Sequence, residues 1–142
     1  MKRLILCADD YALAPGVSRA IRELASAGRL NATSVMTPGP DLAAEAARLL
    51  AVAPPGFRIG LHVTLTGGLT PLTAPRLAMA EGIGSLLMRS HLRRLDRSAV
   101  AAEVEAQMRA FIAAFGAPPA FVDGHQHAHL LPGIRDIVVA AA

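Results

Sequence analysis

The segment from Phe121 to Gly133, FVDGHQHAHLLPG, carries an aspartate and three of the chain's five histidines. Asp123, His125, His127 and His129 stand at alternate positions. A hydrophobic core gains nothing from them, because imidazole and carboxylate groups are costly to bury without partners. The same groups bind metals and transfer protons. The segment therefore predicts a metal site or an acid–base site.

Two other groups of polar residues lie in, or directly after, predicted strands. Asp9 and Asp10 follow the apolar run RLILCA, which predicts a short buried strand. His62 and Thr64 share one face of a further predicted strand, FRIGLHVTLTGG, because side chains alternate along an extended chain. Thr64 is therefore a candidate for substrate contact, although threonine is also simply a good strand former.

The chain is predicted to alternate strand and helix four times. The strands are RLILCA, LNATSVMT, FRIGLHVTLTGG and PPAFVDGHQH, and the helices are APGVSRAIRELASAG, LAAEAARLLAVA, DRSAVAAEVEAQMRAFIAAFG and PGIRDIVVAAA. The connection over residues 67–95 is predicted to be irregular, with a weakly helical middle. This order predicts an α/β fold with parallel strands and crossover helices, in a doubly wound sheet or a (β/α) barrel. Such folds carry their sites at the carboxyl ends of the strands.

The residues at these strand ends form a pattern typical of hydrolytic metal sites. Adjacent aspartates point opposite ways on an extended strand, so we expect Asp9 and Asp10 to have different roles unless the backbone turns between them. Asp123, His125 and His127 share a face if the last strand stays regular that far. A structural His–Asp pair would explain part of this set. Because three strands bring metal-ligating residue types to one side of one sheet, the pattern favours a bound cation. Such a cation would keep some of its coordination positions for water.

Three blocks of the sequence resemble the YdjC/ChbG family of carbohydrate deacetylases. They are LILCADDYALAPGVSRAI, IGLHVTLT and FVDGHQHAHLLPGI, in this order and spacing. The resemblance covers essentially the whole chain and is weak between residues 70 and 95. It implies a (β/α) barrel-like fold and metal-dependent removal of an acetyl group from an N-acetylated sugar, such as a chito-oligosaccharide. It also implies that Asp10, His62 and His125 bind the metal and that Asp9 is the general base.

The chain departs from the family pattern in three respects. Tyr11 stands where the family usually has Phe, and Gly124 stands where a Ser is common. Family chains also run well beyond residue 142. We therefore expect a single YdjC-like domain over residues 1–142 that is incomplete at its C-terminus and amounts to about half a barrel.

The roles of several polar residues stay open at this point. Asp123, His127 and His129 are candidates to orient a metal ligand or to contact substrate, and His127 is a candidate general acid. The cofactor is expected to be one divalent ion. Two imidazole ligands favour Zn²⁺, whereas the family is usually described with Mg²⁺.

Composition restricts the classes of partner. Hydrophobic residues make up 53% and charged residues 18% of the 142 residues, which is enough for one compact domain. The arginine cluster over residues 89–97 has no interleaved aromatic residues, so we expect a solvated flank and no nucleic-acid site. No apolar run is long enough to span a membrane or act as a signal peptide, and the single Cys7 fits a reducing compartment. The expected location is the cytoplasm, and the expected partner is a small acetylated carbohydrate.

Two alternatives to an active deacetylase are kept. The first is a truncated, catalytically silent metal-binding half-domain that forms a homo-oligomer, because four parallel strands leave an open sheet edge. The second is a phosphoesterase with a similar His/Asp set. It is disfavoured because no basic residue is expected near the three motif blocks to hold a phosphate.

Overall fold

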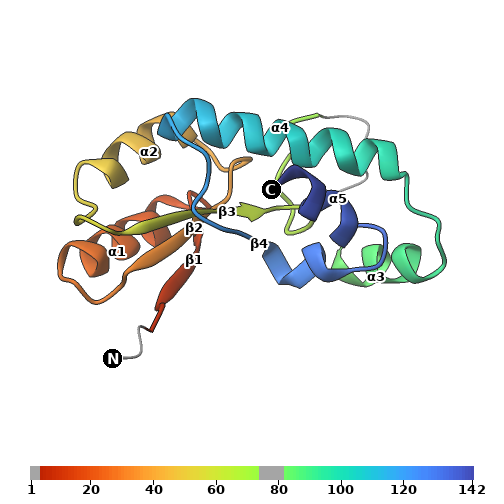
Figure 1. Ribbon diagram of the computed structural model, residues 1–142, viewed down its shortest axis with the longest axis horizontal. Coiled ribbons are helices and arrows are strands. Elements are labelled where there is room, and N and C mark those ends of the chain that lie inside the picture. Colours follow the sequence, from red (N-terminus) through yellow and green to blue (C-terminus); the bar gives the residue numbers. More distant parts are fainter. Residues whose placement is uncertain (1–3, 74–81) are drawn as a thin grey trace.

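The computed structural model describes residues 4–73 and 82–142, which form one parallel sheet with helices around it (Figure 1). The strands are β1 (Cys7–Tyr11), β2 (Ala32–Val35), β3 (Arg58–Val63) and β4 (Val122–Gly124). The helices are α1 (Pro15–Ser26), α2 (Leu42–Leu50), α3 (Ile83–His91), α4 (Arg97–Phe115) and α5 (Arg135–Ala141), with a 3₁₀ segment, η1 (His125–Leu130). None of the helices in these ranges is long and apolar enough to cross a membrane.

The strands lie in the order β1-β2-β3-β4, and every neighbouring pair is parallel. The helices are also neighbours in chain order, α1 with α2, α2 with α4 and α4 with α5. A doubly wound sheet reverses its strand order at a switch point, whereas a (β/α) barrel adds each strand beside the last. The predicted α/β class with parallel strands and crossover helices is confirmed, and the strand order is that of a barrel.

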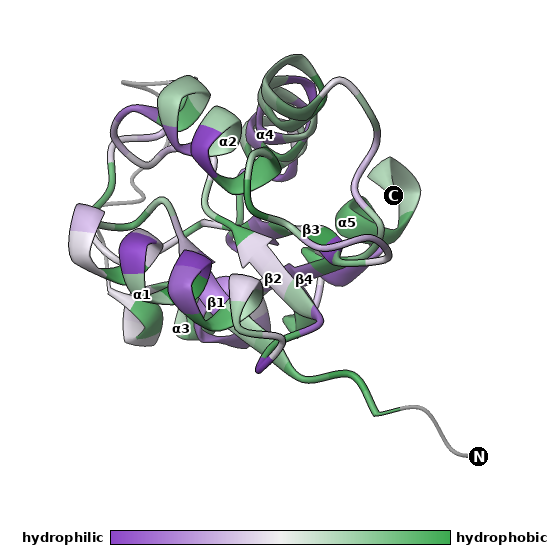
Figure 2. Ribbon diagram, turned by 90° about the vertical axis from the view of Figure 1, so that its left-hand side faces the viewer, coloured by the Kyte–Doolittle hydropathy of each residue, from purple (hydrophilic) through white to green (hydrophobic). Residues whose placement is uncertain are grey.

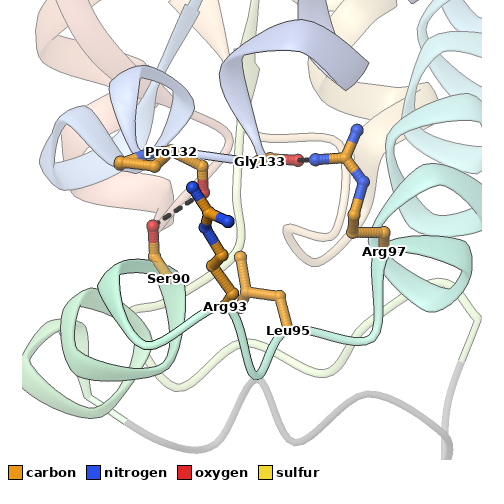
Figure 3. Close-up of a pocket in the computed structure, with 6 residues that line it drawn as sticks. All are labelled: Ser90, Arg93, Leu95, Arg97, Pro132 and Gly133. Atoms are coloured by element: carbon orange, nitrogen blue, oxygen red, sulfur yellow. Dashed lines mark hydrogen bonds between the residues drawn. The ribbon is translucent and has the colours of Figure 1, made fainter.

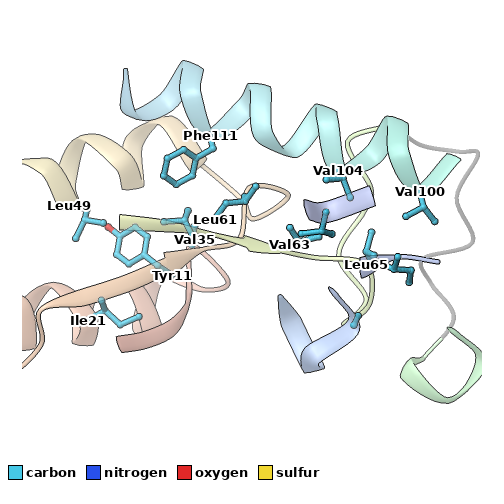
Figure 4. Packing of buried hydrophobic residues seen from close by; sticks show 14 residues of the cluster. Tyr11, Ile21, Val35, Leu49, Leu61, Val63, Leu65, Val100, Val104 and Phe111 are labelled. Carbon is cyan, nitrogen blue, oxygen red and sulfur yellow. The ribbon is translucent and has the colours of Figure 1, made fainter. Parts of the chain in front are cut away.

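The core fills the space between the sheet and the helices that cover it (Figure 4). Members of this core come from the strands, from the loop after β3 and from facing helix positions; they include Tyr11, Ile21, Val35, Leu49, Leu61, Val63, Leu65, Val100, Val104 and Phe111. Leu61 and Val63 alternate with His62 along β3, as the period of a strand requires. Phe111 and Phe115 of α4 stack with ring centroids 4.6 Å apart. This packing fixes α4 against β3 and so sets the position of the sheet's carboxyl edge.

Helix α4 begins and ends at the residues its sequence predicts. The Asp96 carboxylate accepts a hydrogen bond from the Ala99 amide at 3.0 Å, which caps the first turn. Gly116 has a φ of +72° and its amide donates to the Ile112 carbonyl, which closes the last turn. The cap and the glycine together give a 19-residue helix with defined ends.

Tyr11 joins three elements through its hydroxyl group. The oxygen lies 2.8 Å from the Glu45 backbone carbonyl and 3.0 Å from the Glu45 carboxylate, and Arg22 donates to the same oxygen at 3.0 Å. Burial raises the pKa of Tyr11 to about 12, so the hydroxyl keeps its proton for these acceptors. The hydroxyl group that distinguishes Tyr11 from a phenylalanine thus ties β1 to α1 and α2.

Two predictions about secondary structure are wrong in part. The run RLILCA is predicted to be a buried strand, but β1 begins only at Cys7, and Leu4, Ile5 and Leu6 are 79%, 57% and 51% exposed. Figure 2 shows this hydrophobic segment leaving the body of the molecule. The connection over residues 67–95 contains a regular helix, α3, whereas residues 74–81 lie outside the described part.

Replacing Phe111 with alanine tests the contribution of this core. Phe111 is 1% exposed, so Phe111→Ala should lower the free energy of unfolding by about 3–5 kcal/mol, through lost burial and the cavity left behind. The neighbouring Ile112 is 41% exposed, and Ile112→Ala should cost less than about 1 kcal/mol. Urea unfolding followed by circular dichroism measures both. Equal losses would contradict the packing described.

Candidate metal centre

The backbone turns between the two aspartates at the end of β1. Asp10 has a φ of +64°, in the left-handed region, and the pairing of β1 with β2 shifts register between Ala8 and Tyr11. A left-handed residue redirects its side chain relative to a regular strand. The Asp10 carboxylate therefore lies against His62 and His125, whereas Asp9 is exposed.

Asp10, His62 and His125 come together although they lie far apart in the chain. Asp10 Oδ1 is 3.2 Å from His62 Nε2 and 3.0 Å from His125 Nδ1. One ligand atom from each residue lies within 4.8 Å of the other two. Donors bound to one zinc ion at about 2.1 Å in tetrahedral geometry stand roughly 3.4 Å apart. The donor set therefore has the chemistry and the spacing of a site for one divalent cation.

Asp123 orients His62 from the side opposite Asp10. The two residues are register partners on β3 and β4, and His62 Nδ1 lies 2.6 Å from Asp123 Oδ1. An ionised carboxylate only accepts hydrogen bonds, so Nδ1 carries the proton and Nε2 keeps its lone pair facing Asp10. Carboxylates on the second nitrogen of a ligating histidine commonly fix its tautomer and ring orientation. Asp123 thus fixes the His62 ring with Nε2 available as a candidate ligand atom.

His125 owes its position to the end of β4. The strand is predicted to continue through His127, but it stops at Gly124, and Gln126 and His127 both have positive φ values of 51° and 57°. The condition for Asp123, His125 and His127 to share one face is therefore not met, because the chain coils into η1. Thr66 donates to the Gln126 side-chain oxygen at 2.9 Å, which ties this coil to the loop after β3.

Gly67 in the loop after β3 gives the His125 ring its room. Its φ is +94°, and a Cβ atom at this position would stand 2.9 Å from His125 Nε2. The Thr-Gly-Gly sequence carries the signal for a turn here. Nothing in the sequence indicates that the first glycine packs against a histidine 58 residues further on.

Ser34 joins Asp9 to His62. Its hydroxyl lies 3.1 Å from His62 Nδ1 and 3.3 Å from Asp9 Oδ1. Sequence reasoning did not select Ser34, although its place in the second strand would have allowed it.

Cys7, Asp9 and Asp123 also offer ligand atoms within 4.8 Å of one another. Burial and the nearby Asp9 carboxylate raise the pKa of the Cys7 thiol to about 12, so this thiol is protonated at neutral pH.

The remaining candidates lie outside the three-residue cluster. Thr64, a candidate for substrate contact, is fully buried, and its hydroxyl donates to the His62 carbonyl at 2.8 Å. His127 is exposed, and no hydrogen bond joins it to the cluster within the described residues. His129 packs on Gly124, where a Cβ atom would stand 2.7 Å from His129 Nδ1. Burial lowers the pKa of His129, which favours its neutral form.

Two polar side chains of α4, Gln107 and Glu103, bind both ends of the loop after β3 and are called the polar strut below. The Gln107 side chain accepts a hydrogen bond from the Thr64 amide at 2.9 Å and donates one to the Thr64 carbonyl at 2.7 Å. Glu103, fully buried, accepts from the amides of Leu72 and Thr73 at 3.1 and 2.9 Å. These bonds compensate the cost of burying the Glu103 carboxylate. The strut fixes the loop that places Gly67 against His125, and the amphipathic pattern of α4 gave no sign of it.

Glu103→Gln tests this strut. The amide group would turn a donor toward the Leu72 or Thr73 amide, so we expect a loss of about 1–3 kcal/mol in unfolding free energy and faster hydrogen exchange at both amides. The matched control is Glu105→Gln, two residues along on the exposed side of α4, which should change stability by less than about 0.5 kcal/mol. Unchanged exchange at Leu72 and Thr73 would refute the role of Glu103.

The expectation that no basic residue lies near the motif blocks is wrong. Arg97, at the start of α4, donates to the Gly133 carbonyl at 3.0 Å, and Arg93 lines the same pocket beside Pro132. Pro132 and Gly133 belong to the third block. Folding brings together residues about 36 positions apart, which a search for charges near the blocks in sequence could not detect.

Comparisons with known proteins agree with the resemblance of the three blocks. Residues 3–142 match the family described as YdjC-like protein. Chitooligosaccharide deacetylases from Yersinia pestis (strain Pestoides F) and Yersinia pseudotuberculosis serotype O:1b (strain IP 31758) are each 38% identical to the chain over 146 aligned positions. The alignments cover 99% of this chain and 56% of each relative. The chain thus spans little more than half the length of these relatives.

The fold has a counterpart among solved structures. A crystal structure from Enterococcus faecalis V583, of a protein assigned provisionally to cellobiose-phosphate cleavage, superposes with a TM-score of 0.78 at 22% identity. The match covers 96% of this chain and 53% of that one. At this identity the similarity concerns the fold alone. The family match over nearly the whole sequence goes further, and the chain belongs to the YdjC-like family.

Proposed function

We propose that this chain binds one divalent cation through Asp10, His62 and His125 and hydrolyses the acetamide of an N-acetylated sugar. The observation that carries the proposal is the meeting of three ligand atoms within 4.8 Å, with Asp123 holding the second nitrogen of His62. The names of the relatives, chitooligosaccharide deacetylases, support an acetylated carbohydrate as the substrate.

The donor set bears on the identity of the ion. Two imidazole nitrogens and one carboxylate form a set that suits Zn²⁺, whereas Mg²⁺ prefers oxygen ligands and several waters. The family resemblance supports Mg²⁺. We propose that either ion occupies the site and that affinity is higher for Zn²⁺, as the softer imidazole ligands favour.

The protein groups around the site have separable tasks in the proposed reaction. A divalent cation supplies Lewis acidity toward a carbonyl oxygen and a water molecule. Asp9 accepts the proton of the attacking water, and the Ser34 hydroxyl, 3.3 Å from Asp9 Oδ1, orients that carboxylate. The water oxygen bonds to the acetyl carbon, the carbon–nitrogen bond breaks, and the proton taken up by Asp9 passes to the amine nitrogen. Acetate and the sugar amine are released.

Substituting the two neighbouring aspartates separates metal binding from proton transfer. Asp10→Asn should lower metal content and abolish acetate release, because it removes a ligand charge. Asp9→Asn should keep the metal and reduce acetate release by about 10²–10⁴-fold, as expected for loss of a general base. Elemental analysis of the purified variants and an acetate assay on chito-oligosaccharides measure both effects. Full metal content in Asp10→Asn would eliminate the site as drawn.

Two adjacent glycines provide a matched test of the position of His125. Gly67→Ala should weaken Zn²⁺ binding by at least about tenfold, because its Cβ atom would displace the His125 ring. Gly68 has a similar positive φ of 78°, but a Cβ atom there would meet no other atom within 4 Å, so Gly68→Ala introduces strain without a clash. Calorimetric titration with Zn²⁺ compares the two. Equal affinities would show that Gly67 does not position His125.

A second candidate function is a metal-binding domain that self-associates without turnover. The observation in its favour is the exposed apolar segment Leu4–Leu6, which continues from the edge strand β1 (Figure 2). An uncovered apolar edge next to unpaired backbone groups favours pairing with another chain. We propose that two copies cover this segment in a homo-oligomer.

Light scattering tests the association. The chain should run as a dimer, and Ile5→Glu should give a monomer because it places a charge within the apolar segment. Leu24→Glu on α1, at a residue 45% exposed, should leave the dimer unchanged. A chain that stays monomeric at high concentration excludes the association. A dimer with bound metal but no acetate release would favour the silent alternative over the enzyme.

A further inference from the structure

A second site candidate lies between the α3–α4 connection and the turn after η1 (Figure 3). The pocket has a volume of about 320 Å³ and is lined by Ser90, Arg93, Leu95, Arg97, Pro132 and Gly133. No carboxylate is among these lining residues. The two guanidinium groups therefore set the charge of the pocket.

The hydrogen-bonding capacity that remains in the pocket is dominated by donors. Ser90 donates to the Pro132 carbonyl at 2.7 Å, and Arg97 donates to the Gly133 carbonyl at 3.0 Å. Both backbone acceptors are thus satisfied. Arg97 keeps N–H groups to spare, and the Arg93 side chain has no hydrogen bond or ion pair with any described residue. Because guanidinium groups only donate, a ligand here must supply acceptors.

The backbone prepares the two arginines for this role. Gly133 has a φ of +80°, and a Cβ atom at its position would stand 2.9 Å from Arg97 Nη1. Arg93 also has a positive φ, 55°, which directs its side chain to the pocket seen in Figure 3. Asp96, the nearest acidic residue in the chain, is engaged by the Ser98 hydroxyl and the Ala99 amide. The start of α4 adds the positive end of a helix dipole.

We propose that this pocket binds a phosphate group, either as the free ion or as part of a phosphorylated sugar. Two guanidinium groups offer the planar, paired donors that match phosphate oxygens. Leu95 supplies an apolar surface beside them. Pro132 and Gly133 come seven and eight residues after His125, so the same segment carries the proposed metal ligand and this pocket. The phosphate site does not depend on the deacetylase proposal, because its binding is measurable without turnover.

Calorimetric titration of the metal-free chain tests the proposal. Chelation removes any cation, so that phosphate cannot bind at Asp10, His62 and His125. The ligands are inorganic phosphate, N-acetylglucosamine 6-phosphate and unphosphorylated N-acetylglucosamine, at low ionic strength to limit screening. Arg93→Gln and Arg97→Gln should each weaken phosphate binding about tenfold, as expected for loss of a charge-assisted hydrogen bond.

Arg94→Gln is the matched control, because this neighbouring exposed arginine does not line the pocket. The phosphate affinity of this variant should equal that of the unmodified chain. Circular dichroism verifies that all three variants fold. Tighter binding of the sugar phosphate than of inorganic phosphate assigns the group to a substrate, and equal binding assigns it to the free ion. Absence of saturable binding at millimolar phosphate, or an equal loss in Arg94→Gln, overturns the proposal.

Discussion

The hydrogen bond from His62 Nδ1 to Asp123 Oδ1 depends on the pairing of β3 with β4, and the candidate site depends on both. In parallel strands the partner of a residue lies at the same level of the sheet, so a histidine and an aspartate 61 positions apart become neighbours without any loop geometry. The bond leaves His62 Nε2 free on the side of Asp10. A shift of β4 by one residue would turn Asp123 to the opposite face of the sheet and leave the ring without its partner.

Regular strand geometry accounts for His62 and Asp123 only. The other two members of the cluster reach it because the backbone leaves the strand conformation at the carboxyl edge. Asp10 takes a left-handed conformation, and His125 follows the last residue of β4. Non-glycine residues in the left-handed region carry a conformational cost that the surrounding structure must offset. The packing of Tyr11 next to Asp10, and of the loop with Gly67 beside His125, supplies such support.

The order of strands and helices and the ends of α4 could be predicted, because they follow from period, caps and parallel topology. Parallel topology also predicted that polar residues of several strands gather at one edge of the sheet, whereas the set Asp10, His62 and His125 was implied by the resemblance to the family. The end of β4 could not, since PPAFVDGHQH has no glycine or proline after Gly124 to mark a turn. Ser34, Gly67, Glu103 and Gln107 were missed for a related reason. Each acts through contacts with residues far away in the chain, and periodicity carries no information about such contacts.

The packing of His129 on Gly124 has a consequence for how this sequence can change. A serine at position 124 would bring its Cβ atom to 2.7 Å from His129 Nδ1. The two positions are therefore energetically coupled, and their substitutions are not additive. A lineage that exchanges this glycine for serine must first, or at the same time, shrink or redirect the side chain at 129. The order of mutational steps at this strand end is thus constrained by sterics.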